Sequence, residues 1–287
     1  MNYRILPIYD TNYFVKQIAK GENLINESFW FTDINLCEWL KGPKSPECIF
    51  SEFLKIDIFI KQTDSVYVFR KQHAHFENIM NSNKPVEYKY KIALKIAKRT
   101  FKELVDIYSM ICFLLPTVIF VKANNTSIQD DSFAVINEKD VESVRINQAI
   151  QMTWELFRKN SLFKTAKDLF SQDKKSVDKV WIDVYNEIVR VLNNRARYYS
   201  LKPISNKHFN HNNIAVENSV TFTMRDIEII TNTFVDFKQN DPKTREFLAS
   251  ILSEILIDNK KMEFNDVADR YLKYIADTTD TNFYSLD

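Results

Sequence analysis

The four histidines of the chain fall into two pairs, and histidine is the side chain best suited to proton transfer near neutral pH. His73 and His75 are two positions apart, so on a helix they point to different sides and make a poor joint metal site. We interpret this pair as part of a polar helix surface. His208 and His211 lie in an Asn-rich segment whose neighbours suggest a different role.

The stretch around the second pair has the composition of a nucleic-acid surface. Residues 188–216 contain no Asp or Glu. They contain the cations Arg190, Arg195, Arg197, Lys202 and Lys207, interleaved with the aromatic residues Tyr198, Tyr199 and Phe209. Cations neutralise phosphates and aromatic faces stack on bases, so the pattern predicts nucleic-acid contacts through Arg195, Arg197, Tyr198 and His208. An ordinary solvated helix end and loop is the alternative interpretation.

Residues 204–212, Ile-Ser-Asn-Lys-His-Phe-Asn-His-Asn, follow a long amphipathic segment and precede a capped helix. In this arrangement the segment resembles part of the HEPN superfamily, most closely its abortive-infection type, over about residues 138–239. The resemblance implies a helical bundle, often dimeric, in which Asn206 and His211 are the polar residue and the histidine of the motif. The position of the family's arginine is occupied by Ser205, which leaves the charge to Lys207 or a neighbouring arginine.

The resemblance implies RNA cleavage in a cleft shared by two subunits. A neutral His211 would take the 2′-hydroxyl proton, and a nearby cation would stabilise the charge that grows on the phosphate. The expected catalytic set is therefore His211, Asn206 and Lys207, with no metal and no cofactor. This hypothesis makes the chain a HEPN-like protein of phage defence or of a toxin system.

A non-enzymatic role is the competing hypothesis, namely a structural or adaptor protein of a phage particle or another large assembly. The chain has no Gly-x-Gly-x-x-Gly, Walker, Gly-x-Ser-x-Gly, His-Glu-x-x-His or Cys-x-x-Cys motif. The acid groups Asp130-Asp131 and Glu138-Asp140-Glu142 are interpreted as charges of a loop and of a helix N-terminus, without a catalytic role. Whether the chain is an enzyme is therefore left open, and a homo-oligomer or an assembly partner is expected under both hypotheses.

Helical periodicity covers most of the sequence. Expected helices cover about residues 11–20, 33–40, 46–56, 66–80, 86–115, 138–159, 162–172, 176–200, 223–238, 242 onward and 265–276, with short strands at about 3–9 and 133–136. Start signals stand before several of them, at Thr32-Asp33, at Ser45-Pro46 and at Thr223, which with Asp226 resembles a capping box. Asn265 is the expected cap of the last helix.

The glycine content points to the fold class. Two glycines in 287 residues argue against a β-sandwich, a Rossmann domain or a P-loop, all of which use glycine in their turns. The prediction is an all-α or mostly-α chain, a multi-helix bundle with an optional short N-terminal strand or arm. A polar break at residues 123–132 divides it into an N-terminal helical domain of unknown role, residues 1–130, and a HEPN-like bundle, residues 131–287.

Charge, apolar runs and cysteines complete the expectations. The net charge of +1 gives no overall attraction to nucleic acid or membrane, so RNA remains a local prediction. The apolar run at 107–121 is shorter than the ~20 residues that span a bilayer, and we expect a core helix that kinks or stops at Pro116. Cys37, Cys48 and Cys112 are scattered, which predicts reduced thiols in the cytoplasm.

Overall fold

The computed structural model describes residues 5–124, 169–198, 200–207, 213–238 and 242–286, and these form two compact units. The first, called the sheet unit, contains residues 5–105, 169–174 and 265–286. The second, called the helical unit, contains residues 106–124, 175–198, 200–207, 213–238 and 242–264. Each unit is thus assembled from separate stretches of chain. Residue 130, the predicted domain boundary, lies outside the described residues.

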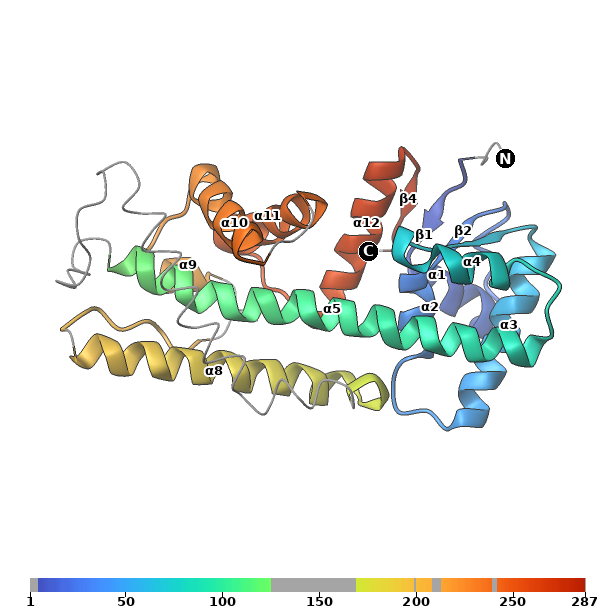
Figure 1. Ribbon diagram of the computed structural model, residues 1–287, viewed down its shortest axis with the longest axis horizontal. Coiled ribbons are helices and arrows are strands. Elements are labelled where there is room, and N and C mark those ends of the chain that lie inside the picture. The colour runs from blue at the N-terminus through green and yellow to red at the C-terminus, as the bar shows by residue number, and fades with distance from the viewer. Residues whose placement is uncertain (1–4, 125–168, 199, 208–212, 239–241, 287) are drawn as a thin grey trace. The chain divides into compact units, whose positions relative to one another are not determined.

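The sheet unit is built on four short parallel strands in the order β3-β2-β1-β4. The strands are β1 (Ile8–Tyr9), β2 (Trp30–Thr32), β3 (Val66–Val68) and β4 (Phe283–Tyr284). Ile8 is in register with Trp30 on one side and with Phe283 on the other, so the last strand pairs with the first (Figure 1). The mostly-α prediction is confirmed, but the chain is not a pure helical bundle because it contains this sheet.

The small number of glycines does not exclude a parallel sheet, because other residues take the left-handed backbone conformation. Asp64 (φ 52°) stands shortly before β3, and Asp280 (φ 52°) shortly before β4. Asp and Asn adopt this conformation more readily than other side chains do. Low glycine content weighs against a β-sandwich, a Rossmann domain or a P-loop, and it sets no such limit on a small parallel sheet of this kind.

Several helices belong to the sheet unit, and the first three begin where the sequence predicted, at Thr11, Asp33 and Pro46. The helices of this unit are α1 (Thr11–Phe14) with a following π-helical turn (Val15–Ala19), α2 (Asp33–Leu40), α3 (Pro46–Gln62), α4 (Ala74–Met80) and most of α12 (Phe264–Thr279). The Thr32 hydroxyl accepts a hydrogen bond from the Asn35 amide (3.2 Å), and the Asn35 side chain accepts one from the Thr32 amide (3.0 Å). Ser45 caps α3 through the Cys48 amide (3.3 Å).

One predicted helix, 66–80, was wrong in its first half. Val66–Val68 form strand β3, Lys71–His73 form a 3₁₀ turn, and only Ala74–Met80 are α-helical. Valine and tyrosine favour strands, and Tyr67, only 1% exposed, packs edge-to-face on Phe31 of β2 at 5.8 Å between ring centroids. Pairing with β2 therefore outweighed the apparent helical period.

Helix α5 (Val86–Ala123) contributes residues 86–105 to the sheet unit and residues 106–123 to the helical unit. It does not stop at Pro116 but continues to Ala123. Pro116 has no N–H for the carbonyl of Cys112, four residues earlier, and beside this interruption the Thr117 hydroxyl donates to the Phe113 carbonyl at 3.0 Å. The helix is long and apolar enough to cross a membrane, with a mean hydropathy of 2.2 over 18 residues, but 83% of that window is buried in the protein.

The helical unit packs around the second half of α5. Its other helices are α8 (Lys174–Tyr198), α9 (Ile214–Glu217), α10 (Met224–Lys238) and α11 (Pro242–Leu256). Tyr108 meets Trp181 and Phe264 edge-to-face at 5.8 and 5.5 Å between centroids. The predicted capping box is confirmed: the Asp226 carboxylate accepts from the Thr223 amide (2.7 Å), and the Thr223 hydroxyl accepts from the Asp226 amide (3.3 Å).

Of the remaining sequence expectations, three lie wholly or mostly outside the described residues and one is wrong. The predicted helix 138–159 and strand 133–136 lie outside the described residues, as does most of helix 162–172. Asn265 does not cap the last helix, because α12 begins one residue earlier at Phe264. The Asn265 side chain instead accepts a hydrogen bond from the Lys41 ammonium at 2.8 Å.

Candidate functional site

Polar side chains follow three neighbouring strands of the sheet. Asp10 comes directly after β1, Asp33 directly after β2 and Arg70 two residues after β3. Since the strands are parallel, their carboxyl ends meet at one edge. Strand β1 is also where the order reverses, with β2 and β3 on one side and β4 on the other. Ligands of open parallel sheets bind beside such a reversal, at the carboxyl ends of the strands.

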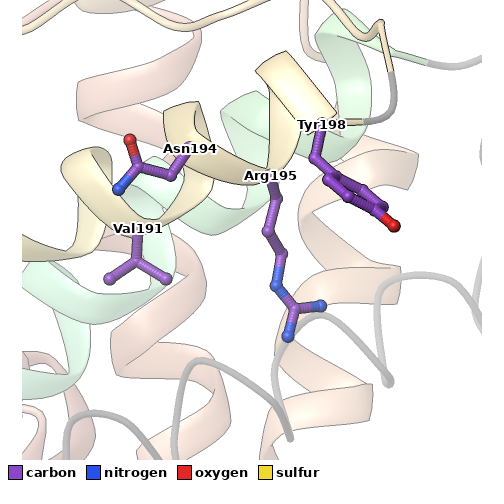
Figure 2. Close-up of a pocket in the computed structure, with 4 residues that line it drawn as sticks. All are labelled: Val191, Asn194, Arg195 and Tyr198. Atoms are coloured by element: carbon purple, nitrogen blue, oxygen red, sulfur yellow. The ribbon is translucent and has the colours of Figure 1, made fainter.

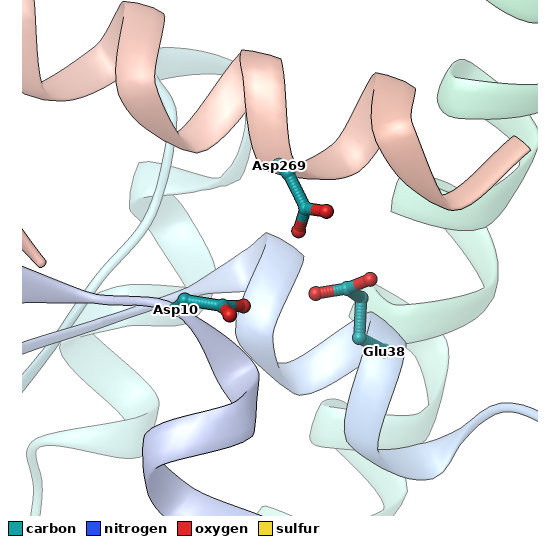
Figure 3. Close-up of side chains that lie close together, drawn as sticks. All are labelled: Asp10, Glu38 and Asp269. Carbon is teal, nitrogen blue, oxygen red and sulfur yellow. The ribbon is translucent and has the colours of Figure 1, made fainter. Parts of the chain in front are cut away.

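Three carboxylates converge at this edge. One oxygen of each of Asp10, Glu38 and Asp269 lies within 4.8 Å of the others, and Figure 3 shows the three groups directed toward a common space. We call them the carboxylate triad. They come from the end of β1, from α2 and from α12. Asp10 is only 2% exposed and the Glu38 side chain 10%, so the charges are held away from bulk water.

The contacts around the triad orient its members. Asp10 occupies the N-cap position of α1, yet its side chain does not cap that helix and instead accepts a hydrogen bond from the Asn12 amide group at 2.9 Å. The Thr11 hydroxyl donates to Glu38 Oε2 at 2.6 Å. The Lys41 ammonium lies 3.8 Å from Glu38 Oε1, one turn further along the chain.

The electrostatics of Glu38 favour binding of a cation at the carboxylate triad. Burial raises the pKa of this carboxyl above its ordinary value, and the negative charge of Asp10 raises it further, while Lys41 and the Thr11 hydroxyl act against both. Like charges this close destabilise one another, and a cation among them would relieve the repulsion. Carboxylate oxygens are the donors preferred by Mg²⁺, Mn²⁺ and Ca²⁺. Within the described part of the chain, no other group of His, Cys, Asp and Glu side chains has metal-binding geometry.

Beside the triad lies a buried ion network centred on Arg70. The Arg70 guanidinium donates to Asp33 Oδ2 from Nε at 2.8 Å, and its Nη2 lies 2.7 Å from Glu103 Oε2. The Thr100 hydroxyl donates to the same Asp33 oxygen at 2.8 Å. Although burial acts to raise the pKa of Asp33, Arg70 outweighs it and the pKa is lowered. Asp33 is therefore an ionised carboxylate whose charge is already neutralised by Arg70.

His73 belongs to this network, so the interpretation of both histidines as a polar surface was wrong for His73. Its side chain is fully buried, with Nε2 3.4 Å from Asp33 Oδ2 and 3.6 Å from Glu103 Oε1. His73 ends the 3₁₀ turn that follows Arg70, and this turn directs the His73 side chain into the protein interior. His75, two residues later, is exposed as expected.

The predicted nucleic-acid residues lie in part at the C-terminal end of α8. Val191, Asn194, Arg195 and Tyr198 line an open groove of about 380 Å³, toward which Figure 2 shows the Arg195 and Tyr198 side chains lying side by side. Tyr198 is 81% exposed. Arg190, one turn earlier, is paired with Glu187 at 2.6 Å, whereas no described residue forms an ion pair with Arg195 or Arg197. We call this surface the α8 groove.

The predicted catalytic set is only partly placed. His208 and His211 lie outside the described residues. Asn206 is exposed. Lys207 is also exposed, and its ammonium contacts the Glu217 carboxylate, the first acid beyond the acid-free stretch. That contact neutralises the charge that the HEPN resemblance assigns to Lys207.

Sequence reasoning missed the carboxylate triad, because its members are separated by up to 259 positions and form no local motif. One signal was present. Asp10 follows the apolar run Ile5–Tyr9, and Thr32-Asp33 follows Phe29–Phe31. A polar residue directly after a short apolar run, occurring twice, is typical of the carboxyl ends of buried parallel strands. Glu38 and Asp269 lie in helices and carry no comparable signal.

Comparisons with family models, with curated proteins and with solved structures each find no match to this chain.

Proposed function

We propose that the sheet unit is a divalent-cation-dependent hydrolase of phosphate esters, with the carboxylate triad as the cation site. The observation that carries the proposal is the convergence of Asp10, Glu38 and Asp269 within 4.8 Å at the carboxyl edge of a parallel sheet. Mg²⁺ sites of enzymes combine a few carboxylates with phosphate oxygens of the substrate. A bound cation there would polarise a phosphoryl oxygen and lower the pKa of a water molecule.

The donor set favours Mg²⁺ or Mn²⁺. It contains oxygen ligands alone, whereas Zn²⁺ sites draw on His and Cys. In this proposal Asp10 is the fixed ligand at the end of β1. Glu38 is oriented by the Thr11 hydroxyl, and Asp269 closes the site from α12.

The first test measures cation binding directly. Calorimetric titration with Mn²⁺ should show one binding event for the wild-type chain, and Asp269→Asn should abolish it or weaken it at least tenfold. Asp277→Asn is the matched control, since Asp277 is an exposed acid on the same helix and should leave binding unchanged. Equal Mn²⁺ binding by the wild type and Asp269→Asn would overturn the proposal.

The second test measures activity. The wild-type chain is incubated with bis(p-nitrophenyl) phosphate, with mixed RNA and with single-stranded DNA, each with Mg²⁺, Mn²⁺ or EDTA. Hydrolysis should require a cation and be lost in Asp10→Asn. Hydrolysis at equal rates in EDTA would contradict a cation-dependent mechanism.

A second candidate is metal-independent RNA cleavage by a HEPN-like protein of phage defence or a toxin system, with His211, Asn206 and Lys207 as its catalytic set. The observation that favours it is the α8 groove, where Arg195 and Tyr198 lie side by side upstream of the motif. The same RNA assay distinguishes the two candidate functions. Cleavage that persists in EDTA and is lost in His211→Ala supports this second candidate, and the absence of both cleavage and cation binding supports a structural or adaptor role.

A further inference from the structure

Helix α12 carries Asp269 on one side of its buried face and Tyr271 on the other. Ala268, Leu272 and Ala276 are fully buried and mark that face. Residues two positions apart are about 200° apart around a helix, so Asp269 and Tyr271 flank the face. A rotation of α12 about its axis would therefore displace both side chains. It would change the distance of Asp269 from Asp10 and Glu38 and the distance of Tyr271 from Arg70.

Tyr271 is held by a cation that is itself fixed in place. The Arg70 guanidinium carbon lies 4.9 Å from the centre of the Tyr271 ring. The nitrogens of the same group bond to Asp33 after β2 and to Glu103 on α5, and its side chain is 11% exposed. These bonds hold the Arg70 guanidinium in place when α12 shifts. Because a cation–π contact is favourable only within a narrow range of positions, such a shift would weaken the contact with Tyr271.

The beginning of α12 has a second attachment close to the triad. The Lys41 ammonium donates to Asn265 Oδ1 at 2.8 Å and lies 3.8 Å from Glu38 Oε1. This contact fixes the first turn of α12 against the end of α2. It does not by itself fix the rotation one turn later, where Asp269 and Tyr271 lie.

The charge on Arg70 is already balanced by the two acids it contacts, Asp33 and Glu103. Asp33 is therefore a fourth carboxylate at this edge of the sheet that does not compete for a cation, and Arg70 is not free to bind a substrate anion. Besides these ion pairs, the guanidinium of Arg70 lies over the ring of Tyr271.

We infer that Arg70 and Tyr271 are positioning residues for the carboxylate triad: their contact fixes the rotation of α12 and thereby places Asp269 against Asp10 and Glu38. The inference rests on the proposed cation site. It assigns no contact with the cation to either residue. Groups that orient metal ligands commonly contribute ten- to a hundredfold to metal affinity.

The experiment is a Mn²⁺ titration of the full chain at a temperature well below the unfolding midpoint of every variant. Tyr271→Leu removes the aromatic face and should weaken Mn²⁺ binding about tenfold or more. Tyr271→Phe keeps that face and should bind within about twofold of the wild type. If Tyr271→Leu does not fold, Tyr271→Met takes its place, because the unbranched methionine side chain adapts more readily to the space left by the ring.

Leu272→Ala is the control for stability. It opens a cavity on the buried face of the same helix and keeps the Tyr271 ring, so it should lower the unfolding temperature while leaving Mn²⁺ affinity within about threefold. Equal loss of affinity in Leu272→Ala and Tyr271→Leu would overturn the inference, since both would then act through stability. So would wild-type affinity in Tyr271→Leu.

Mn²⁺ titration of Asp269→Asn distinguishes a failure of this inference from a failure of the proposed function. If the wild type binds Mn²⁺, Asp269→Asn does not and Tyr271→Leu binds like the wild type, the positioning role alone is overturned. If the wild type and Asp269→Asn give the same titration, the cation site is overturned and the positioning role with it.

Discussion

Protonation of Glu38, a member of the carboxylate triad, should affect how the free energy of unfolding depends on pH. Its pKa is raised in the folded chain by burial first and then by Asp10. The folded state therefore binds this proton more tightly than the unfolded state does. The stabilising effect of that proton is fully present below the ordinary carboxyl pKa of 4.5 and is lost as pH rises through the raised value.

If the proposed cation site is correct, a divalent cation should reverse that loss, because carboxylates bind metal ions in their ionised form. We expect Mg²⁺ to raise the unfolding temperature more at pH 7.5 than at pH 5.0, measured by a thermal shift assay in matched ionic strength. Glu38→Gln should reduce the Mg²⁺ effect at pH 7.5. The same Mg²⁺ effect at both pH values would count against Glu38 as a ligand.

Arg70 should be a site of large destabilisation, because it neutralises two acids in a buried setting. Arg70→Met leaves Asp33 and Glu103 without that cation, and breaking a buried pair in this way costs about 3–5 kcal/mol. Arg99→Met is the control: Arg99 also approaches Glu103, at 3.6 Å, but is 51% exposed. It should cost less than about 1 kcal/mol in urea unfolding. An equal loss of unfolding free energy in Arg70→Met and Arg99→Met would show that burial of the ion network does not determine its contribution to stability.

At the scale of the element, helix α5 allows a direct test of its assigned face. Ile96 is fully buried, and Ile96→Asp places an unpaired charge in the core of the sheet unit, which should cost several kcal/mol. Lys91→Asp, on the exposed side of the same helix, should change stability by about 0.5 kcal/mol or less. The two unfolding midpoints are compared by circular dichroism. An unchanged midpoint for Ile96→Asp would show that the face is assigned incorrectly.

Elements with long periodic patterns could be predicted from the sequence, and elements that depend on distant partners could not. Helices α5, α8 and α10 have apolar stripes several turns long, and the caps at Ser45 and Thr223 are local signals. Strands of two or three residues carry too little periodicity to be distinguished from a helix turn, as Val66–Val68 showed. The triad depends on the pairing of β4 with β1 and on the packing of α12, both of which are contacts between the ends of the chain.

At the scale of the whole molecule, one helix links two units whose unfolding can be followed separately. Cys37 is buried in the sheet unit, Cys112 is buried in the helical unit and Cys48 is exposed. Burial also raises the pKa of the thiols of Cys37 and Cys112, which keeps them in the unreactive protonated form. The three thiols should therefore report on three different environments.

In a thiol-labelling assay without reductant, Cys48 should react rapidly in the native protein, and Cys37 and Cys112 should react only on unfolding. Because α5 supplies core side chains to both units, we expect the two buried thiols to become reactive at the same urea concentration. Single-cysteine variants and mass spectrometry assign each label. Well-separated midpoints for Cys37 and Cys112 would show that the units unfold independently despite the shared helix.

The pairing of β4 with β1 also has a consequence for biosynthesis. Residue 269 leaves the ribosome after residue 38 by about 12–46 s at ordinary rates of translation. During that interval Asp10 and Glu38 exist in a nascent chain that lacks both the third carboxylate and the last strand. A ribosome-bound fragment therefore cannot assemble the triad, however well its first helices fold. If the finished site attacks phosphate esters that the cell needs, this chain order delays the activity until synthesis is nearly complete.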